Sequence, residues 1–182
     1  TFDFANGLAS PVFGLTGVTA LTSGTDFHCA LTAAGARCWG KNSDGQLGVG
    51  TTSTLFTPTL VPGDWRRVAT GKYATCGIKG IDREVFCWGQ NFRNWNVPGP
   101  APELLETPVR VPGVSGALDV AVGSDHACAV ELDGTVRCWG DTLYGRVGDG
   151  TTTGAIQSPI APMVGGNPLT ASHIAAADHG TA

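Results

Sequence analysis

The chain has 182 residues, of which 42% are hydrophobic and only 14% charged, with 27 glycines and a formal net charge of −4. The acidic balance argues against a nucleic-acid surface, which needs a basic stripe, and no apolar run approaches the ~20 residues of a membrane-spanning helix. Many glycines and prolines, few charges and no helical periodicity predict an all-β protein with many tight turns, long enough for one domain with a core. The chain begins with Thr1 rather than Met, which we interpret as a mature or excised product.

The first segment, residues 1–14, is typical of the end of a repeat whose beginning is missing. Its Ser10–Gly14 stretch opens with a Ser/Thr-Pro pair that recurs at Thr57–Gly63, Thr107–Gly113 and, loosely, Ser158–Pro162. Such an opening followed by alternating apolar residues favours an edge strand, where proline loses no ladder hydrogen bond. We therefore expect an edge strand near Ser10–Gly14.

A Cys-Trp-Gly motif recurs three times, at Arg37–Gly40, Phe86–Gly89 and Arg137–Gly140. Its tryptophans are 49 and then 51 residues apart, and a motif at a fixed period of this size indicates a repeat protein. The period divides the rest of the chain into three full repeats and the start of a partial one, at residues 15–63, 64–113, 114–166 and 167–182.

Each repeat is predicted to hold short strands followed by a loop and a Pro-containing strand. In the first repeat the strands are expected at 18–24, 27–31 and 36–40, before a polar, glycine-rich loop at 42–52. The loop of the second repeat, residues 91–100, departs from this pattern, whereas the third repeat is regular. Residues 174–182 align with 121–129 and begin a fourth repeat.

The six cysteines fall into three pairs, Cys29/Cys38, Cys76/Cys87 and Cys128/Cys138. In the last pair the Asp133–Gly134 turn signal lies midway, which predicts a β-hairpin with the cysteines facing each other at ~4.5–5.5 Å, within disulfide reach. Zinc is the competing interpretation, but metal sites usually bring cysteines in close Cys-x-x-Cys pairs. The pattern favours disulfides, and disulfides indicate a secreted or cell-surface protein.

Three motifs together resemble a known repeat family. Gly-x-x-His-x-Cys-Ala-Val (Gly123–Val130), Asp-Gly-x-Val-x-Cys-Trp-Gly (Asp133–Gly140) and Gly-Gln-Leu-Gly-x-Gly-Thr-Thr (Gly45–Thr52) are similar to the regulator of chromosome condensation repeat, in particular to its disulfide-bearing version in secreted and surface proteins. The resemblance covers nearly the whole chain. It implies a β-propeller-type fold with about three complete four-stranded blades and partial blades at both ends.

The resemblance also assigns structural roles. Trp39, Trp88 and Trp139 would pack between neighbouring blades, and each cysteine pair would lock two strands within a blade. A glycine shared by the repeats (Gly24, Gly71 and Gly123) marks a bend at the end of the first strand, where a Cβ atom would crowd.

Three blades are too few to close a ring, since propellers close with ~4–8 blades and the family form is usually seven-bladed. Open ends expose strand edges and apolar faces. Three solutions stay open: the chain is a fragment of a longer seven-bladed propeller, two chains pair to close one ring, or subunits stack in a non-closing assembly.

The titratable residues give weak signals for metal or catalytic chemistry. Three histidines at similar repeat positions (His28, His126 and His179) are interpreted as structural hydrogen-bonding groups, because equivalent positions lie one blade apart and cannot share an ion. Three aspartates in glycine-rich loops (Asp44, Asp141 and Asp149) lack the close oxygen ligands of a calcium loop and are interpreted as turn residues. We find no catalytic motif and expect no enzyme activity, metal or cofactor.

The variant loop of the second repeat is the candidate interaction site. Phe92, Arg93, Trp95 and Asn96 combine aromatic, cationic and amide groups, which are enriched in interface hot spots. Trp beside Asn also suits stacking on a sugar ring, and local packing of Trp95 beneath the loop is the alternative.

The sequence therefore predicts a secreted, non-catalytic propeller-type scaffold for protein–protein interaction or self-assembly. Its partner is expected to be another protein or a second copy of the chain, with no nucleic acid and no membrane span. A carbohydrate-binding module that uses the Phe92–Asn96 loop is the alternative function.

Overall fold

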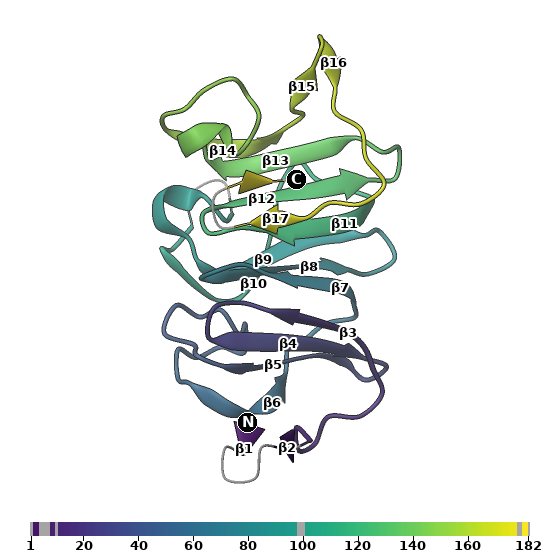
Figure 1. Ribbon diagram of the computed structural model, residues 1–182, viewed down its shortest axis with the longest axis vertical. Helices are drawn as coiled ribbons and strands as arrows, with labels where there is room; N and C mark the ends of the chain where they lie inside the picture. The colour runs from purple at the N-terminus through teal and green to yellow at the C-terminus, as the bar shows by residue number, and fades with distance from the viewer. Residues whose placement is uncertain (1, 4–7, 10, 98–100, 178–179, 182) are drawn as a thin grey trace.

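Three four-stranded antiparallel sheets follow one another along the molecule (Figure 1). The computed structural model describes residues 2–3, 8–9, 11–97, 101–177 and 180–181. We call the sheets blades 1, 2 and 3. The predicted all-β architecture with four-stranded units is confirmed, and the exact repeat boundaries stay a prediction.

Within each blade, every strand pairs with the strands that come directly before and after it in the chain. Blade 1 comprises β3 (Val18–Ser23), β4 (Phe27–Thr32), β5 (Gly35–Gly40) and β6 (Leu55–Leu60). Blade 2 comprises β7 (Trp65–Thr70), β8 (Ala74–Lys79), β9 (Glu84–Gln90) and β10 (Leu104–Arg110). Blade 3 comprises β11 (Ala117–Val122), β12 (His126–Glu131), β13 (Val136–Asp141) and β14 (Ala155–Ile160).

Short elements flank the blades. They are β1 (Phe2–Asp3), β2 (Leu8–Ala9), η1 (Phe92–Asn94), η2 (Leu143–Gly145), β15 (Met163–Val164), β16 (Asn167–Pro168), β17 (Ala176–Ala177) and β18 (Gly180–Thr181). Within the described residues, no helix is long and apolar enough to cross a membrane.

The edge strand expected near Ser10–Gly14 is not formed in the described part of that stretch. Residues 11–14 contain a turn instead, and the N–H of Leu15 donates to the carbonyl of Val12 over 3.3 Å. A strand needs a neighbour to pair with, and no described strand pairs with residues 11–14. Ser10 lies outside the described residues.

All three cysteine pairs form disulfides across directly opposed residues of adjacent strands. Cys29 pairs with Cys38, Cys76 with Cys87 and Cys128 with Cys138, with Cα–Cα distances of 4.0 to 4.1 Å. In the chain-entropy model, closing a loop of this length stabilises the fold by about 2.5–3 kcal/mol. Each disulfide therefore reinforces the two central strands of its own blade.

The glycine of the Cys-Trp-Gly motif is required by the backbone. Gly40, Gly89 and Gly140 have φ values of +109°, +99° and +116°. A Cβ atom on any of them would lie 2.5 Å from a main-chain oxygen of the preceding hairpin arm. The motif thus ends in glycine for two reasons: the backbone has a positive φ at this position, and the neighbouring strand's backbone leaves no room for a Cβ atom.

The predicted bend glycines are contact points between blades. A Cβ atom on Gly24 would lie 2.6 Å from the carbonyl oxygen of Gly71, and one on Gly71 would lie 2.1 Å from that of Gly123. A Cβ atom on Gly123 would in turn lie 2.7 Å from the carbonyl oxygen of Ala177. The short strand β17 therefore stands beside β11 as the innermost strand of a further blade.

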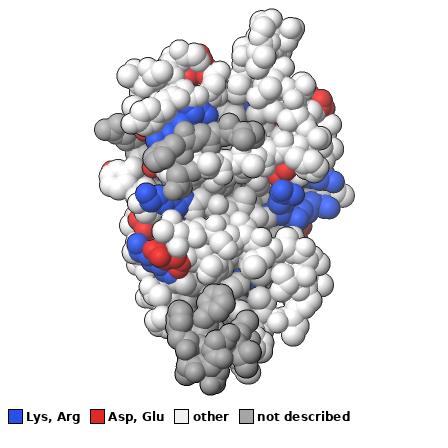
Figure 2. All heavy atoms as spheres, in the orientation of Figure 1, with Lys and Arg blue, Asp and Glu red and all other residues white. Residues whose placement is uncertain are grey.

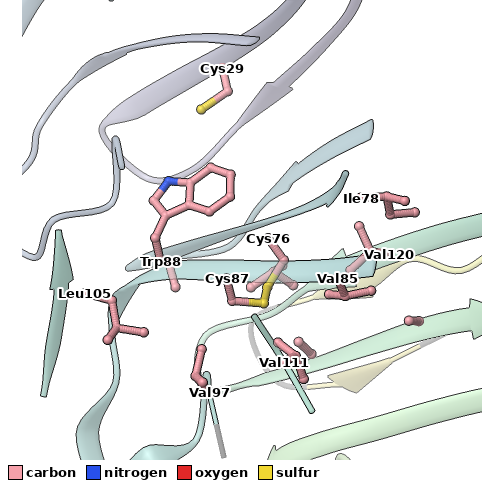
Figure 3. Close-up of a cluster of buried hydrophobic side chains, with 14 of the residues drawn as sticks. Cys29, Cys76, Ile78, Val85, Cys87, Trp88, Val97, Leu105, Val111 and Val120 are labelled. Atoms are coloured by element: carbon pink, nitrogen blue, oxygen red, sulfur yellow. A yellow bond between two sulfur atoms is a disulfide. The ribbon is translucent and has the colours of Figure 1, made fainter. Parts of the chain in front are cut away.

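The largest buried cluster joins all three blades rather than filling each blade separately. In Figure 3 the side chain of Trp88 lies between Cys29 of blade 1 and the Cys76–Cys87 disulfide of its own blade. The same view places Val120 of blade 3 beside Ile78 and Val85 of blade 2. The largest part of the hydrophobic core thus lies in the seams between blades, and a smaller cluster lies within blade 3 and its loop.

Trp65 fills a space peculiar to blade 2. It is 6% exposed, and its Nε1–H donates to the carbonyl of Val61 over 3.1 Å. A Cβ atom on Gly77 would lie 2.7 Å from Cε3 of this ring. The register places Ala30 and Ala129 at the matching positions of blades 1 and 3, so blade 2 has glycine where its tryptophan needs room.

We expect Gly77→Ala to lower the free energy of unfolding by about 1–3 kcal/mol, because an added methyl group overpacks a filled core. Urea denaturation followed by circular dichroism measures this loss. In the Trp65→Leu background the same substitution should cost much less, since the ring is gone. Equal costs in both backgrounds would contradict the overpacking argument.

Candidate functional site

The tryptophans of blades 2 and 3 each bind the loop of the preceding blade. Trp88 and Trp139 are fully buried. The Nε1–H of Trp88 donates to the carbonyl of Gln46 over 2.9 Å, and that of Trp139 donates to the carbonyl of Asn96 over 3.0 Å. Each seam therefore combines an apolar ring with one specific main-chain acceptor.

Asparagine side chains hold these acceptor loops in shape. Oδ1 of Asn42 accepts from the N–H of Leu47, and Oδ1 of Asn91 accepts from the N–H groups of Asn96 and Val97. Both asparagines are fully buried. A buried amide that replaces missing backbone partners fixes the loop conformation, and the loop carbonyl then points into the seam.

Trp39 differs from its two counterparts. It is partly exposed, and its ring lies 5.6 Å from that of His28. Within the described residues, no loop of a preceding blade receives its indole. Trp88 and Trp139 thus each pack against a preceding blade, whereas the blade-packing role of Trp39 stays a prediction.

The structure divides the candidate loop of the second repeat. Trp95 is 2% exposed and Asn96 is fully buried, whereas Phe92 is 53% exposed. Nδ2 of Asn96 donates to the carbonyl of Trp88 over 3.1 Å. Trp95 and Asn96 therefore pack inside the protein. Phe92 is the aromatic side chain that the loop presents to solvent.

A cavity of about 280 Å³ lies beside this loop, between blades 2 and 3. It is lined by Gln90, Phe92, Trp95, Asp125, Asp141 and Ala155. Nε1 of Trp95 is buried without a hydrogen-bond partner in the described part of the chain. Oδ2 of Asp125 pairs with Nη1 of Arg146 at 3.2 Å. The cavity thus offers aromatic walls and carboxylate acceptors, while the Trp95 N–H is buried away from solvent.

Sequence reasoning missed Gln90, Asp125 and Asp141 as members of one site. They come from two blades, and only the packing of blade 3 on blade 2 brings them beside the loop. The unusual composition of residues 91–97 was the one signal, and it marked the loop without revealing its neighbours.

The histidines and loop aspartates make separate local contacts. Nδ1 of His28 lies 2.9 Å from Oγ of Ser23, and His126 is fully buried. His179 lies outside the described residues. Hydrogen bonds from the Thr151 hydroxyl and backbone lower the pKa of Asp149. Among the described residues, no three His, Cys, Asp or Glu side chains are grouped to hold a metal ion.

Exposed apolar side chains occur on all three blades, and one of them, Leu21 of blade 1, has buried or partly buried counterparts in the other blades. Leu21, Val68 and Val120 occupy the same position of the innermost strands. Val120 is 1% exposed against blade 2, Val68 is partly exposed, and Leu21 is 63% exposed. Figure 2 shows charged side chains in a few small mixed patches over an otherwise uncharged face. At this position blade 1 thus exposes an apolar side chain that its counterpart in blade 3 buries.

Two family models, both described as the regulator of chromosome condensation (RCC1) repeat, match the chain at residues 38–78 and 118–146. A curated relative, the ultraviolet-B receptor UVR8 of Arabidopsis thaliana, is 28% identical over 160 residues, which cover 84% of this chain and 36% of the receptor. The chain therefore spans about a third of this relative's length.

Two solved structures have a similar fold. Prp20p from Saccharomyces cerevisiae, studied for its binding properties to Gsp1p and histones, matches with a TM-score of 0.75 and 21% identity, over 93% of this chain and 44% of that chain. The ectodomain of the receptor kinase CR4 from Physcomitrella patens matches with a TM-score of 0.51 and 22% identity, over 88% of this chain and 34% of that chain. These likenesses confirm the predicted partial β-propeller.

Gly48 and Gly148 offer a matched test of the tryptophan seam. Both have nearly the same φ, +71° and +72°, so alanine meets similar backbone strain at each. A Cβ atom on Gly48 would lie 2.6 Å from Nε1 of Trp88, whereas one on Gly148 would meet Cβ of Pro162 at 3.0 Å. We expect Gly48→Ala to cost about 1–3 kcal/mol more than Gly148→Ala in urea denaturation. Equal losses would show that the indole contact does not limit this position.

Proposed function

Because this chain is an RCC1-like repeat protein, we propose that it is a secreted, non-catalytic scaffold whose open blades bind protein partners or further copies of the chain. Its propeller-type repeat fold is suited to protein interaction. Prp20p, which has a similar fold, has described binding properties to Gsp1p and histones. The identity of this chain's own partners is part of the proposal.

The observation that carries the proposal is the exposure of Leu21. Val120 at the matching position is covered by the preceding blade and is 1% exposed, whereas Leu21 is 63% exposed. In the described part of the chain, no complete blade precedes blade 1. Large exposed apolar residues grouped on one face favour an interaction surface over a solvated one. A further blade, from a partner or from a second copy, is the surface that complements this face.

The three disulfides support the secreted location. Cross-strand disulfides form and persist in oxidising compartments and are rare in the cytosol. The similar fold of a receptor-kinase ectodomain is consistent with an extracellular position. Thiol counting on denatured, unreduced protein tests this part of the proposal, since free thiols would remove its support.

The first experiment is the solution mass by light scattering behind a sizing column. We expect a species of two or more chains, and we expect Leu21→Glu to shift it to a single chain, because a carboxylate would be buried in an apolar contact. Leu132→Glu is the matched control: Leu132 is also 63% exposed, but it lies beyond the end of β12, in the hairpin turn of blade 3. A wild-type chain that stays monomeric at every concentration would contradict self-assembly. In that case, a protein partner that is pulled down by the wild-type chain but not by Leu21→Glu would support the scaffold function.

A carbohydrate-binding function is the second candidate, and the cavity beside Phe92 and Trp95 favours it. Sugar hydroxyls are donors, so a polyhydroxylated ligand would donate to the carboxylates of Asp125 and Asp141 that line the cavity. The exposed ring of Phe92 offers an apolar face for stacking. The volume of about 280 Å³ is close to the lower end of ligand pockets, about 300 Å³, and so suits a small ligand.

We expect Phe92→Ala to weaken the binding of any glycan found on an array by about two- to tenfold, because one aromatic contact is lost. Trp95→Phe should weaken it similarly, because a smaller ring leaves a smaller aromatic wall in the cavity. Phe56→Ala is the control, since Phe56 is 88% exposed on the outer strand of blade 1. A glycan that binds all four proteins equally would rule out this cavity, and an array without any binding would remove the candidate.

A further inference from the structure

Two residues at the ends of the central strands occupy equivalent positions in blades 1 and 3. The N–H of Lys41 donates to the carbonyl of Asp26 over 2.9 Å in blade 1, and the N–H of Asp141 donates to the carbonyl of Asp125 over 2.8 Å in blade 3. Both donors directly follow the glycine of the Cys-Trp-Gly motif. The side chains at these two positions can therefore be compared from blade to blade.

Blade 1 places opposite charges at these positions, whereas blade 3 places like charges. Nζ of Lys41 lies 4.0 Å from Oδ2 of Asp26, which forms an ion pair within blade 1. In blade 3 both positions are aspartates, Asp125 and Asp141. Like charges that face each other across neighbouring strands destabilise a sheet. The carboxylate pair of blade 3 therefore favours a cation that its two strands do not supply.

One arginine of the chain offsets part of this charge. Nη1 of Arg146 lies 3.2 Å from Oδ2 of Asp125, and its guanidinium carbon lies 5.6 Å from the centre of the Tyr144 ring. Oδ1 of Asp141 accepts from the N–H of Leu143 over 2.6 Å. In the part of the chain that the structure describes, Asp141 takes part in no ion pair. Two carboxylates and one guanidinium leave a net charge of −1, which one further cation would balance.

The cavity between blades 2 and 3 combines these carboxylates with aromatic walls. Phe92 and Trp95 line it together with Asp125 and Asp141. A guanidinium group stacks on aromatic faces and forms charge-assisted hydrogen bonds with carboxylates, and Arg146 already makes both kinds of contact beside the cavity. The volume of about 280 Å³ lies just below that of ligand pockets, about 300 Å³, and so suits a single side chain.

We propose that this cavity binds the side chain of an arginine carried by a partner protein, with the guanidinium donating to Asp141 and stacking on Phe92. The proposal rests on the scaffold function proposed above, and it names the group that the scaffold recognises. All residues that line the cavity belong to blades 2 and 3, so the site is complete within the seam between them. The arginine supplies to Asp141 the positive charge that Lys41 supplies to Asp26 in blade 1.

The test is a titration of the ¹⁵N-labelled chain with N-acetyl-argininamide, followed by amide correlation spectra. We expect saturable shifts grouped on Gln90, Phe92, Asp141 and Leu143. N-acetyl-citrullinamide is the matched control ligand, because it replaces the guanidinium with a neutral group of nearly the same shape. It should bind at least about tenfold more weakly, since a hydrogen bond to a charged group is lost. N-acetyl-lysinamide should fall between the two, because an ammonium keeps the charge but lacks a planar face for stacking.

Asp141→Asn removes the carboxylate charge without changing the size of the side chain. The remaining oxygen can still accept from the N–H of Leu143, so the loop should keep its shape while the affinity for N-acetyl-argininamide falls about tenfold. Asp149→Asn is the matched control, because Asp149 accepts from the N–H of Thr151 two residues along in the same way. Asp149 is not among the described residues that line the cavity, so this variant should bind like the wild-type chain.

Asp141→Lys recreates in blade 3 the pairing that Lys41 makes with Asp26. It should abolish the saturable shifts, because the chain then supplies its own cation beside Asp125. The spectra show whether each variant is folded, and the comparison of the arginine and citrulline ligands on the wild-type chain decides the matter even if a variant does not fold.

Shifts that do not saturate, that lie elsewhere, or that are equal for the arginine and citrulline ligands would overturn the proposal, as would an unchanged affinity in Asp141→Asn. The outcome is separable from that of the scaffold function. Self-association or capture of a partner without binding of N-acetyl-argininamide would leave the scaffold in place and remove the arginine site. Saturable binding of N-acetyl-argininamide by a chain that does not self-associate would keep the arginine site and restrict the scaffold to other proteins.

Discussion

The hydrogen bond from a buried indole to the preceding blade's loop is the contact on which the rest of the structure depends. An unpaired indole N–H in the core costs free energy, and Trp88 and Trp139 avoid that cost by donating to a protein acceptor. The acceptor is a main-chain carbonyl of Gln46 or Asn96. Aiming that carbonyl into the seam requires a loop with positive φ values, supplied by Gly45 and Gly48 in blade 1 and by Asn94 in blade 2. Tryptophan, glycine turn and buried asparagine are therefore parts of one contact shared by consecutive repeats.

A contact shared by consecutive repeats leaves one half unused at each end of any finite array. Blade 1 has the tryptophan, Trp39, and the described residues hold no earlier loop to receive it. Blade 3 has the loop, Gly145–Gly148, beside an apolar cavity. Blades 1 and 3 are therefore unlike, because one has the tryptophan half of the contact and the other has the loop half. This polarity distinguishes the end surfaces of the array from ordinary exposed apolar residues, which have no fixed complement.

Much of this architecture follows from sequence, and the remainder has identifiable physical causes. The hairpins and disulfides were predictable because Asp133–Gly134 turns and cysteine spacing act locally. The partner of Trp88 was not, since it is a backbone carbonyl, and no side-chain pattern marks Gln46 as an acceptor. The burial of Trp95 likewise depends on how blade 3 packs against blade 2. Sequence pattern therefore identified the components within each blade, whereas the contacts between blades required the structure.

The C-terminal segment places this chain's own strands beside blade 3. Asp119, with its side chain only 2% exposed, accepts from the N–H of Ile174 and pairs with Arg67, which anchors the segment close to β11. β17 follows this anchor and pairs with β18, so two strand places next to blade 3 are taken by the chain itself. A buried carboxylate needs partners to stay charged, and Asp119 finds them in blade 2 and in the C-terminal segment. One side chain thus links the packing of blade 3 on blade 2 to the path of the segment that follows blade 3.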